Sequence, residues 1–455
     1  MWGGLEWLNL IYFLYSLVLA LGMLLTLPYW LYQILRHGKY RRGLPERMGR
    51  VPARLLSGGR PLPNAPPARI IWVHAVSLGE VLAVGRLVTE MRRVFPQHRV
   101  LVSTTTDTGQ DLARKRFGAE NVFYFPMDFA FAIRPYLRVL RPEMIVLAET
   151  EFWPNFLRLV RASGARIAVV NARISDRSWP RYRRFGGALG KMLGQIDRFL
   201  AQTPEDSSRL ESLGADPARV QVTGNLKFDV NLPPAPAIVE SLRQSLAAEG
   251  ASPVLVCGST VEDEEAPLLR AFENVRVGHP RAAMILAPRH PERFDKVAGL
   301  LRQMEISFHR RSAWQAEPLA GAVLLVDTIG ELAWLYALAD VAFVGGSLVP
   351  RGGHNIIEPA QHGVAIVTGN HTENFRDIVS LFQSRDAVRL VGLSELPLTL
   401  MHLLDHPAER RALGQRAKQT IQSQMGATER TLAALENLVS RTPDRPPGAR
   451  AAHND

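Results

Sequence analysis

The sequence predicts a two-domain α/β protein, each domain built on a doubly wound parallel sheet, with an apolar helix ahead of the first domain. The chain has 455 residues, which is more than one hydrophobic core usually serves. Apolar runs bounded by turn signals alternate with amphipathic stretches, as in parallel sheets covered by helices. The alternation stops at the Pro-rich segment 231–237 (NLPPAPA) and then starts again.

The apolar runs give the expected strands, and the amphipathic stretches between them give helices. The strands expected in the first half are 69–74, 99–103, 121–125, 144–148, 166–171, 198–201 and 220–223, with helical stretches at 80–94, 130–140, 154–162 and 204–213. The strands expected in the second half are 254–257, 284–287, 323–326, 341–344 and 365–368. We therefore expect a membrane anchor over 1–36, a first α/β domain over 37–230, a linker over 231–240, a second α/β domain over 241–440 and a disordered tail over 441–455.

The N-terminal segment is expected to attach the protein to a membrane. No charged residue occurs from Trp7 to Leu35, which is longer than the ~20 apolar residues that cross a bilayer core. Basic residues gather between Arg36 and Arg50, so the positive-inside rule places the rest of the chain in the cytoplasm. A cleaved signal peptide would have a shorter apolar region and the opposite charge order. An insertion that enters the bilayer without crossing it stays open.

Composition narrows the class of partner without fixing it. The 54 Lys and Arg residues exceed the 43 Asp and Glu residues, for a formal net charge of +11. Such an excess favours nucleic acid, phosphorylated substrates or an anionic membrane surface. The single cysteine, Cys257, excludes an internal disulfide and follows an apolar run, so we expect it to be a small buried residue.

Polar residues follow several expected strands of the first domain. The segment HAVSLGE opens a helix after a strand, and Glu80 at its end is either a helix-start carboxylate or a general base. Glu149 and Glu151 follow another strand, where they either orient a hydroxyl-bearing acceptor or pair with a nearby arginine. Lys227, just before the linker, is either a solvated charge or a contact for an anionic ligand.

The second domain has strand-exit segments that suit a bound anion. Arg289 follows a strand, and its guanidinium fits a phosphate or a carboxylate. The segment 327–332 (DTIGEL) joins a strand to a helix. In the Gly-rich segment 343–359, Asn355 and Glu358 form a helix cap, a phosphate and ribose site, or both. The sequence has no strict Asp-x-Asp pair, no Walker loop and no His-Glu-x-x-His spacing, so no metal is expected.

Taken together, these segments resemble the Kdo transferases, the 3-deoxy-D-manno-octulosonic acid transferases of lipopolysaccharide assembly (glycosyltransferase family 30). The matching segments, in family order, are HAVSLGE (74–80), TTTDTG (104–109), ETEFWPN (149–155), NARISDRS (171–178), TGNLKFD (223–229), PRHPERF (288–294), DTIGEL (327–332) and FVGGSLVPRGGHNIIEP (343–359). The resemblance covers nearly the whole chain after the anchor. It implies a GT-B fold, in which two Rossmann-like domains face each other across a cleft.

The resemblance also implies a reaction and a set of site residues. It implies transfer of Kdo from CMP-Kdo to lipid IV(A), the phosphorylated lipid A precursor, at the cytoplasmic face of the inner membrane, with inversion and with no metal, cofactor or nucleic-acid partner. Glu80 matches the general base, Glu149 an acceptor-side carboxylate of the transition state, and Lys227 a lysine near the donor. The residues that match the CMP-binding segments are Pro288, Arg289, Ile329, Gly330, Glu331, Asn355, Ile356, Ile357 and Glu358.

Three other functions stay open from the sequence. A nucleotide-sugar epimerase shares the two-domain architecture but would lack an anchor. A membrane-associated GT-B enzyme that uses a UDP-sugar, for instance on an undecaprenyl-linked acceptor, is a closer rival. A membrane-tethered envelope scaffold without catalysis would explain the anchor and the basic charge, but it would not explain the polar residues at the strand ends.

Overall fold

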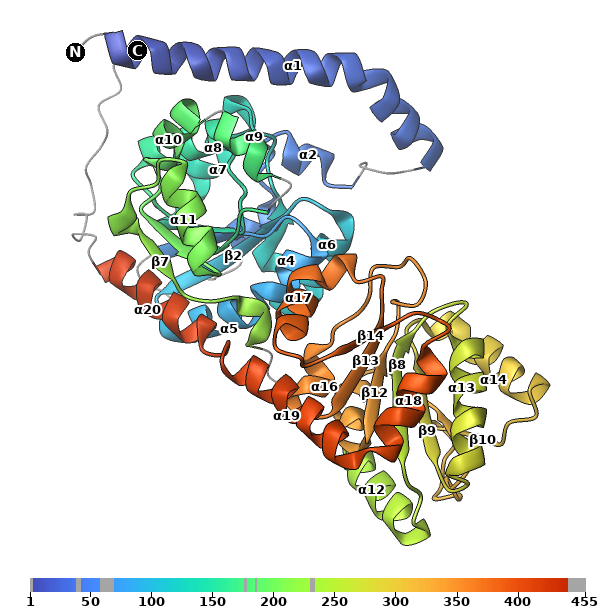
Figure 1. The fold of residues 1–455 in the computed structure, drawn as a ribbon. Helices are drawn as coiled ribbons and strands as arrows, with labels where there is room; N and C mark the ends of the chain where they lie inside the picture. The colour runs from blue at the N-terminus through green and yellow to red at the C-terminus, as the bar shows by residue number, and fades with distance from the viewer. Residues whose placement is uncertain are drawn as a thin grey trace. The chain divides into compact units, whose positions relative to one another are not determined.

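The computed structural model of the protein contains two compact units. It describes residues 3–37, 42–57, 69–175, 178–184, 186–229 and 234–440 (Figure 1). The expected tail and the first residues of the expected linker lie outside these ranges. One unit comprises residues 1–230 together with 426–455, and the other comprises residues 231–425.

The first unit is built on a seven-stranded parallel sheet with the order β3-β2-β1-β4-β5-β6-β7. The strands are β1 (Arg69–His74), β2 (His98–Thr104), β3 (Val122–Tyr124), β4 (Met144–Ala148), β5 (Arg166–Ala172), β6 (Arg198–Ala201) and β7 (Val220–Val222). All of the strands expected here are confirmed, with ends that shift by at most one residue. Strands β1 and β4 pair at the point where the strand order reverses, which is where doubly wound sheets bind ligands at their carboxyl edge.

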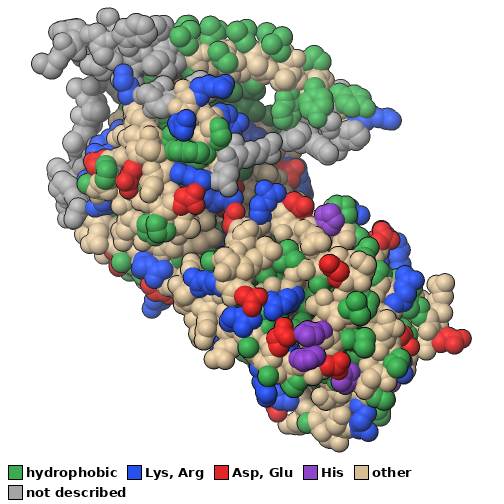
Figure 2. All heavy atoms as spheres, in the orientation of Figure 1, with side chains coloured by type: hydrophobic (Ala, Val, Ile, Leu, Met, Phe, Trp, Pro, Cys, Tyr) green, Lys and Arg blue, Asp and Glu red, His purple; other side chains and the backbone are tan. Residues whose placement is uncertain are grey.

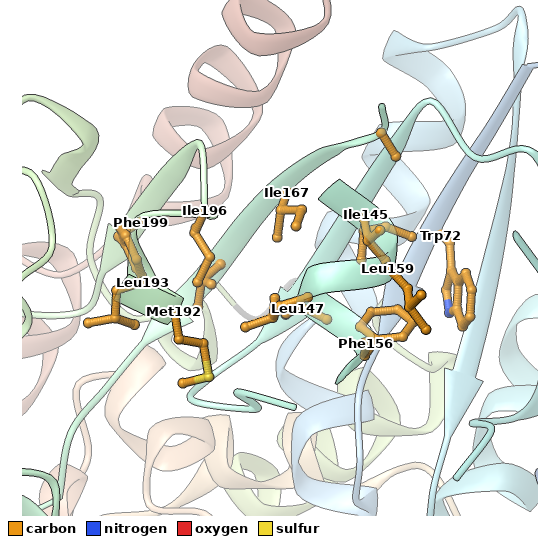
Figure 3. Packing of buried hydrophobic residues seen from close by; sticks show 14 of the residues in the cluster. Trp72, Ile145, Leu147, Phe156, Leu159, Ile167, Met192, Leu193, Ile196 and Phe199 are labelled. Atoms are coloured by element: carbon orange, nitrogen blue, oxygen red, sulfur yellow. The ribbon is translucent and has the colours of Figure 1, made fainter. Parts of the chain in front are cut away.

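Helices cover both faces of this sheet and bury two hydrophobic clusters. They are α4 (Leu78–Ala83), α5 (Gly85–Val94), α6 (Asp107–Phe117), α7 (Ala130–Leu140), α8 (Pro154–Ser163), α9 (Trp179–Arg184), α10 (Gly186–Leu193) and α11 (Pro204–Ser212), preceded by the short α2 (Leu44–Arg47) and α3 (Ala53–Ser57). Side chains alternate along β1, so Trp72 enters one cluster while Ile71 and Val73 enter the other. Figure 3 shows the Trp72 cluster, where α8 contributes Phe156. The amphipathic stretch 80–94 forms two helices that meet at Val84.

Helix α20 (Ala427–Ser440) belongs to the first unit although it follows the second unit in sequence. Its start is held by the buried carboxylate of Asp229, which accepts hydrogen bonds from the backbone N–H groups of Gly426 (2.8 Å) and Thr428. Arg86 of α5 pairs with Glu429. The sequence assigned this segment to 241–440; the structure packs the helix on α5 and β5 instead, because its apolar side completes a core cluster of the first unit.

Helix α1 (Gly3–His37) contains a segment, Tyr12–Trp30, that is long and apolar enough to cross a membrane. The helix continues past Pro28. Hydrophobic side chains gather along it in Figure 2. Its N-terminal half contacts the first unit, since the Ser16 hydroxyl accepts a hydrogen bond from the Asn155 amide at 2.9 Å and the Arg158 guanidinium lies over the Tyr12 ring.

The second unit is built on another seven-stranded parallel sheet, with the order β10-β11-β9-β8-β12-β13-β14. The strands are β8 (Val254–Thr260), β9 (Ala283–Pro288), β10 (Phe308–Arg310), β11 (Val323–Leu325), β12 (Val341–Val344), β13 (Ala365–Gly369) and β14 (Arg389–Val391). The order reverses between β8 and β12. The sequence missed the edge strands β10 and β14, because they are short and carry arginine, so neither forms an apolar run.

Helices also cover this second sheet, which completes the predicted fold class of two doubly wound α/β units. They are α12 (Ala237–Glu249), α13 (Glu265–Gly278), α14 (Phe294–Gln303), α15 (Leu332–Leu335), α16 (Ile357–Gln361), α17 (Arg376–Ser384), α18 (Leu396–Asp405) and α19 (Pro407–Gln422). Cys257 is buried in the core of this unit, as expected.

Candidate active site

Glu80 lies at the start of α4, beyond the carboxyl end of β1, and its carboxylate is fixed by two hydrogen bonds. The backbone N–H of Val76 donates to Oε2 at 2.8 Å, and the hydroxyl of Ser77 donates to Oε1 at 3.0 Å. Ser77 is also the N-cap of α4, accepting from the backbone N–H of Glu80. Glu80 is therefore a helix-start carboxylate, the first of the two roles that the sequence predicts. The second role, a general base, stays open, because a general base must also be held in a fixed position.

The environment of Glu80 favours its protonated form. Burial raises the pKa of Glu80 to about 7, and the negative charges of Glu149 and Glu151 contribute in the same direction. The hydrogen bonds from Val76 and Ser77 oppose the shift but do not cancel it. A carboxylate with a pKa near neutrality can take a proton and still be ionised when substrate arrives, which suits general-base catalysis.

Glu149 follows β4 at the same edge of the sheet and has an unusual backbone conformation. Its φ is +57°, in the left-handed region that residues other than glycine seldom adopt. Its backbone N–H donates to the carbonyl of Val170 at 2.9 Å, which holds this turn on the neighbouring strand β5. Strained residues of this kind cost about 1–3 kcal/mol and cluster at functional sites.

Lys227 completes this group in the first unit. Its Nζ lies 3.6 Å from Oε1 of Glu149, and both side chains are partly exposed. The backbone N–H of the preceding residue, Leu226, donates to the Asn171 side chain at 3.0 Å, which fixes the turn. A partly exposed ion pair contributes little to stability, so this contact by itself does not hold the fold together. The structure thus brings Glu80, Glu149 and Lys227 together in one unit.

Glu151, which the sequence considered beside Glu149, also belongs to this group. Its carboxylate accepts a hydrogen bond from Trp153 Nε1 at 3.0 Å. Burial raises the pKa of Glu151, and the charge of Glu149 adds to the rise. Three carboxylates and one lysine therefore share the carboxyl edge of β1 and β4.

Arg289 lies at the exit of β9 in the second unit. Its backbone N–H donates to the carbonyl of Thr260 at 2.8 Å. Burial lowers the pKa of His354 to about 4, and the charge of Arg289 contributes to the decrease. The same charge acts on Glu358, lowering its pKa against a larger increase caused by burial. Arg289, His354 and Glu358 are thus close enough to interact, and His354 is a site residue that the sequence noted only as part of the Gly-rich segment.

Asn355 and Glu358 cap α16 in a slightly different register from the expected one. The sequence placed Asn355 at the N-cap, but the helix begins at Ile357 and its N-cap is Ile356. The Asn355 side chain still accepts from the backbone N–H of Ile357 at 3.1 Å and donates to Glu358 at 3.3 Å. The Asn355 side chain therefore links the start of α16 to the Glu358 carboxylate.

The segment 327–332 is an exposed turn in which the Glu331 carboxylate is already paired. The Ile329 side chain is largely exposed, and Gly330 has a φ of +94°. The Glu331 carboxylate accepts from the Thr328 hydroxyl at 2.6 Å and pairs with Arg311 at 2.7 Å. Because the carboxylate is already occupied within the protein, a ligand at this loop would meet main-chain groups.

One buried residue of the second unit was missed by sequence reasoning. Glu264 lies ahead of α13 and binds backbone N–H groups of the Gly-rich segment. The signal available was the acidic run 262–265 directly after a strand. Within the ranges that the structure describes, no group of three or more His, Cys, Asp or Glu side chains is arranged to hold a metal ion.

Comparisons with known proteins agree on one family. A family model described as 3-deoxy-D-manno-octulosonic-acid transferase (kdotransferase) matches residues 42–230. A 3-deoxy-D-manno-octulosonic acid transferase of Bordetella pertussis is 38% identical over 446 residues, 93% of this chain and 99% of that one. The enzyme of the same name from Haemophilus influenzae is 32% identical over 408 residues, 89% of this chain and 93% of that one.

A solved structure supports the fold alone. The crystal structure of a putative UDP-N-acetylglucosamine 2-epimerase from Listeria monocytogenes matches with a TM-score of 0.52 and 15% identity. The match covers 83% of this chain and 98% of that chain. A chain with a different described activity therefore has the same arrangement of two α/β units, so the fold by itself does not fix an activity.

Proposed function

Because the chain belongs to the Kdo transferase family and has the GT-B fold, we propose that it transfers Kdo from CMP-Kdo to lipid IV(A) with inversion. The observation that carries the proposal is Glu80, a carboxylate fixed by two hydrogen bonds, with a pKa raised to about 7, beside Glu149 and Lys227. These are the residues that match the family's general base, acceptor-side carboxylate and donor-side lysine.

In the proposed reaction, Glu80 takes the proton of an acceptor hydroxyl. The acceptor oxygen attacks the anomeric carbon of Kdo from the face opposite the nucleotide, a new C–O bond forms, and the bond from that carbon to the phosphate oxygen breaks. CMP leaves with the electron pair, and the proton stays on Glu80. General-base assistance of this kind contributes ~10²–10⁴ in rate.

Glu149 and Lys227 are proposed to act through charge. Lys227 would stabilise the negative charge of the donor, while Glu149 would stabilise the positive charge that develops on the sugar ring in the transition state. Their mutual contact of 3.6 Å keeps both side chains oriented before substrate binds. Neither role requires Lys227 and Glu149 to stay in contact during the reaction.

We propose that the second unit holds CMP without a metal. Pro288 and Arg289, the backbone of 329–331 and the 355–358 segment would line this site, and Arg289 supplies one cation. A monophosphate leaving group carries less charge than a diphosphate, so an arginine and helix-start N–H groups can stabilise it. Undiminished transfer in the presence of EDTA would support this, and restoration of activity by Mg²⁺ after EDTA treatment would contradict it.

We also propose that the protein sits on the cytoplasmic face of the inner membrane through α1. Tyr12 and Ser16 contact the first unit, and the chain that follows α1 re-enters the same unit at α2. The exposed apolar side chains of α1 are proposed to enter the membrane, with the basic residues of 36–50 near anionic headgroups.

The test is a reconstituted reaction. Full-length protein in detergent would be incubated with lipid IV(A) and freshly prepared CMP-Kdo, and the products followed by mass spectrometry. We expect the acceptor mass to rise by whole Kdo units with release of CMP, and we expect Glu80→Gln to bind CMP but to transfer ~10²-fold more slowly or worse. Transfer from a UDP-sugar instead would favour the rival glycosyltransferase, and the absence of both nucleotide binding and transfer would favour a scaffold.

A further inference from the structure

A buried carboxylate holds the loop that follows β12. Glu264 is completely buried and lies directly ahead of α13. Its Oε1 accepts from the backbone N–H groups of Ser347 and Leu348, both at 2.8 Å. Its Oε2 accepts from those of Gly346 at 2.7 Å and Val261 at 3.0 Å. Hydrogen bonds to an ionised acceptor are about twice as strong as neutral ones, so four of them make this the best-held turn of the site described here.

The held loop passes very close to the exit of β8. A Cβ placed on Gly345 would lie 2.6 Å from the carbonyl oxygen of Ser259 and 2.8 Å from Oε2 of Glu264. Gly346 has a φ of +71°. Successive N–H groups in such a turn usually gather around an anion from solution. Here the protein's own carboxylate takes that place, so these N–H groups are already occupied.

Hydrogen bonds connect this loop to the residues proposed to bind the nucleotide. The carbonyl of Gly346 accepts from the backbone N–H of Gly353 at 2.7 Å, and Gly353 directly precedes His354 and Asn355. A Cβ on Gly346 would lie 2.6 Å from the His354 ring, so the two turns are in direct contact. A shift of the loop at Gly346 would therefore move the 353–358 segment.

We propose that Glu264 is a positioning residue for the donor nucleotide: it fixes the 345–348 loop and, through Gly346 and Gly353, sets the place of Asn355 and the start of α16. Glu264 itself touches backbone groups of the protein and acts through them. The inference rests on the proposed function, because it takes CMP-Kdo as the ligand of this site.

The experiment compares three variants of the full-length protein. Glu264→Gln keeps the size of the side chain but replaces one oxygen by an NH₂ group, which then faces N–H donors. Glu264→Asp keeps the charge on a side chain one methylene shorter. Glu273→Gln, on the outer part of α13 in a surface pair with Arg276, is the matched control.

For Glu264→Gln we expect KM for CMP-Kdo and the dissociation constant for CMP to rise about tenfold or more, because two charge-assisted hydrogen bonds are lost. KM for lipid IV(A) should stay within about twofold, since Glu264 acts on the donor segment alone in this proposal. For Glu264→Asp, both donor constants should lie between those of Glu264→Gln and those of the wild type. For Glu273→Gln, both should equal the wild-type values.

A role limited to stability gives a different result. It would reduce the amount of folded enzyme, and so the maximal rate, while KM for CMP-Kdo stayed at the wild-type value; that outcome overturns the inference. If Glu264→Gln does not fold, Glu264→Asp is the test variant, and a wild-type KM for CMP-Kdo in that variant overturns the inference as well.

The experiment also separates the inference from the proposed function. A wild-type protein that does not bind CMP would contradict both. Equal CMP binding by wild type and Glu264→Gln would contradict the inference alone.

Discussion

At the residue scale, Glu80 combines a structural and a chemical role in one side chain. Its hydrogen bonds with Val76 and Ser77 fix the start of α4, and its burial beside Glu149 and Glu151 makes ionisation unfavourable. A cap that served only the helix would gain from full ionisation, because a negative charge at a helix N-terminus is favourable. The raised pKa therefore indicates that this position was not optimised for capping alone.

The raised pKa predicts the pH dependence of Kdo transfer. The base works only when ionised, so kcat/KM should fall as the pH drops below about 7, by about tenfold per unit well below it. Initial rates between about pH 5.5 and 8.5 measure this. In Glu151→Gln the midpoint should move to lower pH, because a negative charge that raises the pKa of Glu80 is gone. A flat profile in both proteins would remove Glu80 from the role of base.

The same pKa predicts a stability effect of opposite sign to the effect on activity. Between the ordinary carboxyl value of 4.5 and about 7, folded Glu80 binds a proton that the unfolded chain has lost, so the free energy of unfolding decreases as pH rises through this window. Glu80→Gln has no charge at this position, so it lacks this decrease. Between pH 5.5 and pH 8, its free energy of unfolding should fall by about 1–3 kcal/mol less than that of the wild type.

Denaturant unfolding at the two pH values checks this expectation. Glu436→Gln, an exposed position on α20, is the control, and its pH difference should equal that of wild type. A Glu80→Gln protein whose stability changes with pH exactly as wild type does would show that the carboxyl is not held in an unfavourable environment.

At the element scale, the path of α20 shows how one buried carboxylate can fix a helix against a distant part of the chain. Asp229 ends the TGNLKFD segment that also carries Lys227, and it binds the first backbone N–H groups around the start of α20. Gly224, in the same segment, has a φ of +96°, and a Cβ there would lie 3.2 Å from that of Ala427. The turn that positions Lys227 is thus packed against α20.

We expect Asp229→Ala to destabilise the protein by about 1–3 kcal/mol, because it leaves buried N–H groups at a helix start without an acceptor. Asp229→Asn keeps one acceptor oxygen, so it should destabilise the protein less than Asp229→Ala does. Urea unfolding followed by tryptophan fluorescence measures both. An unchanged midpoint in Asp229→Ala would mean that α20 is held by its apolar contacts alone.

At the scale of the whole molecule, α1, the proposed anchor, belongs to the first unit. Asn155, which binds Ser16 of α1, is the second residue of α8, which follows the Glu149–Trp153 segment. The Asp128 carboxylate accepts hydrogen bonds from the backbone N–H groups of Asn155 and Phe156. The helix proposed to attach the protein to lipid and the residues proposed to face the acceptor therefore share one structural support.

The proposed membrane attachment can be tested with two exposed positions of α1. Leu21→Lys combined with Leu25→Lys puts charges on its apolar side, which costs about 2–3 kcal/mol per residue in hydrocarbon. We expect this double variant to move from the membrane pellet to the soluble fraction after cell lysis, or to lose binding to anionic vesicles. Leu398→Lys, equally exposed on α18, should behave as wild type. Retention of the double variant in the pellet as folded protein would argue against α1 as the anchor.

The sequence by itself determined the fold class, nearly all strands and the polar segments at their carboxyl ends. These follow from short-range patterns: apolar runs such as 144–148 are strands because they are buried on both faces, and the residues after them must lie at the sheet edge. The family resemblance added the expected roles of Glu80, Glu149 and Lys227, which stay predictions. The short edge strands β10 and β14 escaped because their burial depends on neighbours in space.

Only the tertiary structure decided the contacts between residues distant in sequence. It pairs Lys227 with Glu149, joins α20 to the first unit through hydrogen bonds to Asp229, and binds Glu264 to backbone N–H groups of the Gly-rich loop. The same holds for the raised pKa of Glu80, since burial and the charges of two later glutamates produce it. Such features depend on how the elements pack and on the dielectric environment that packing creates, and no local pattern of residue types contains that information.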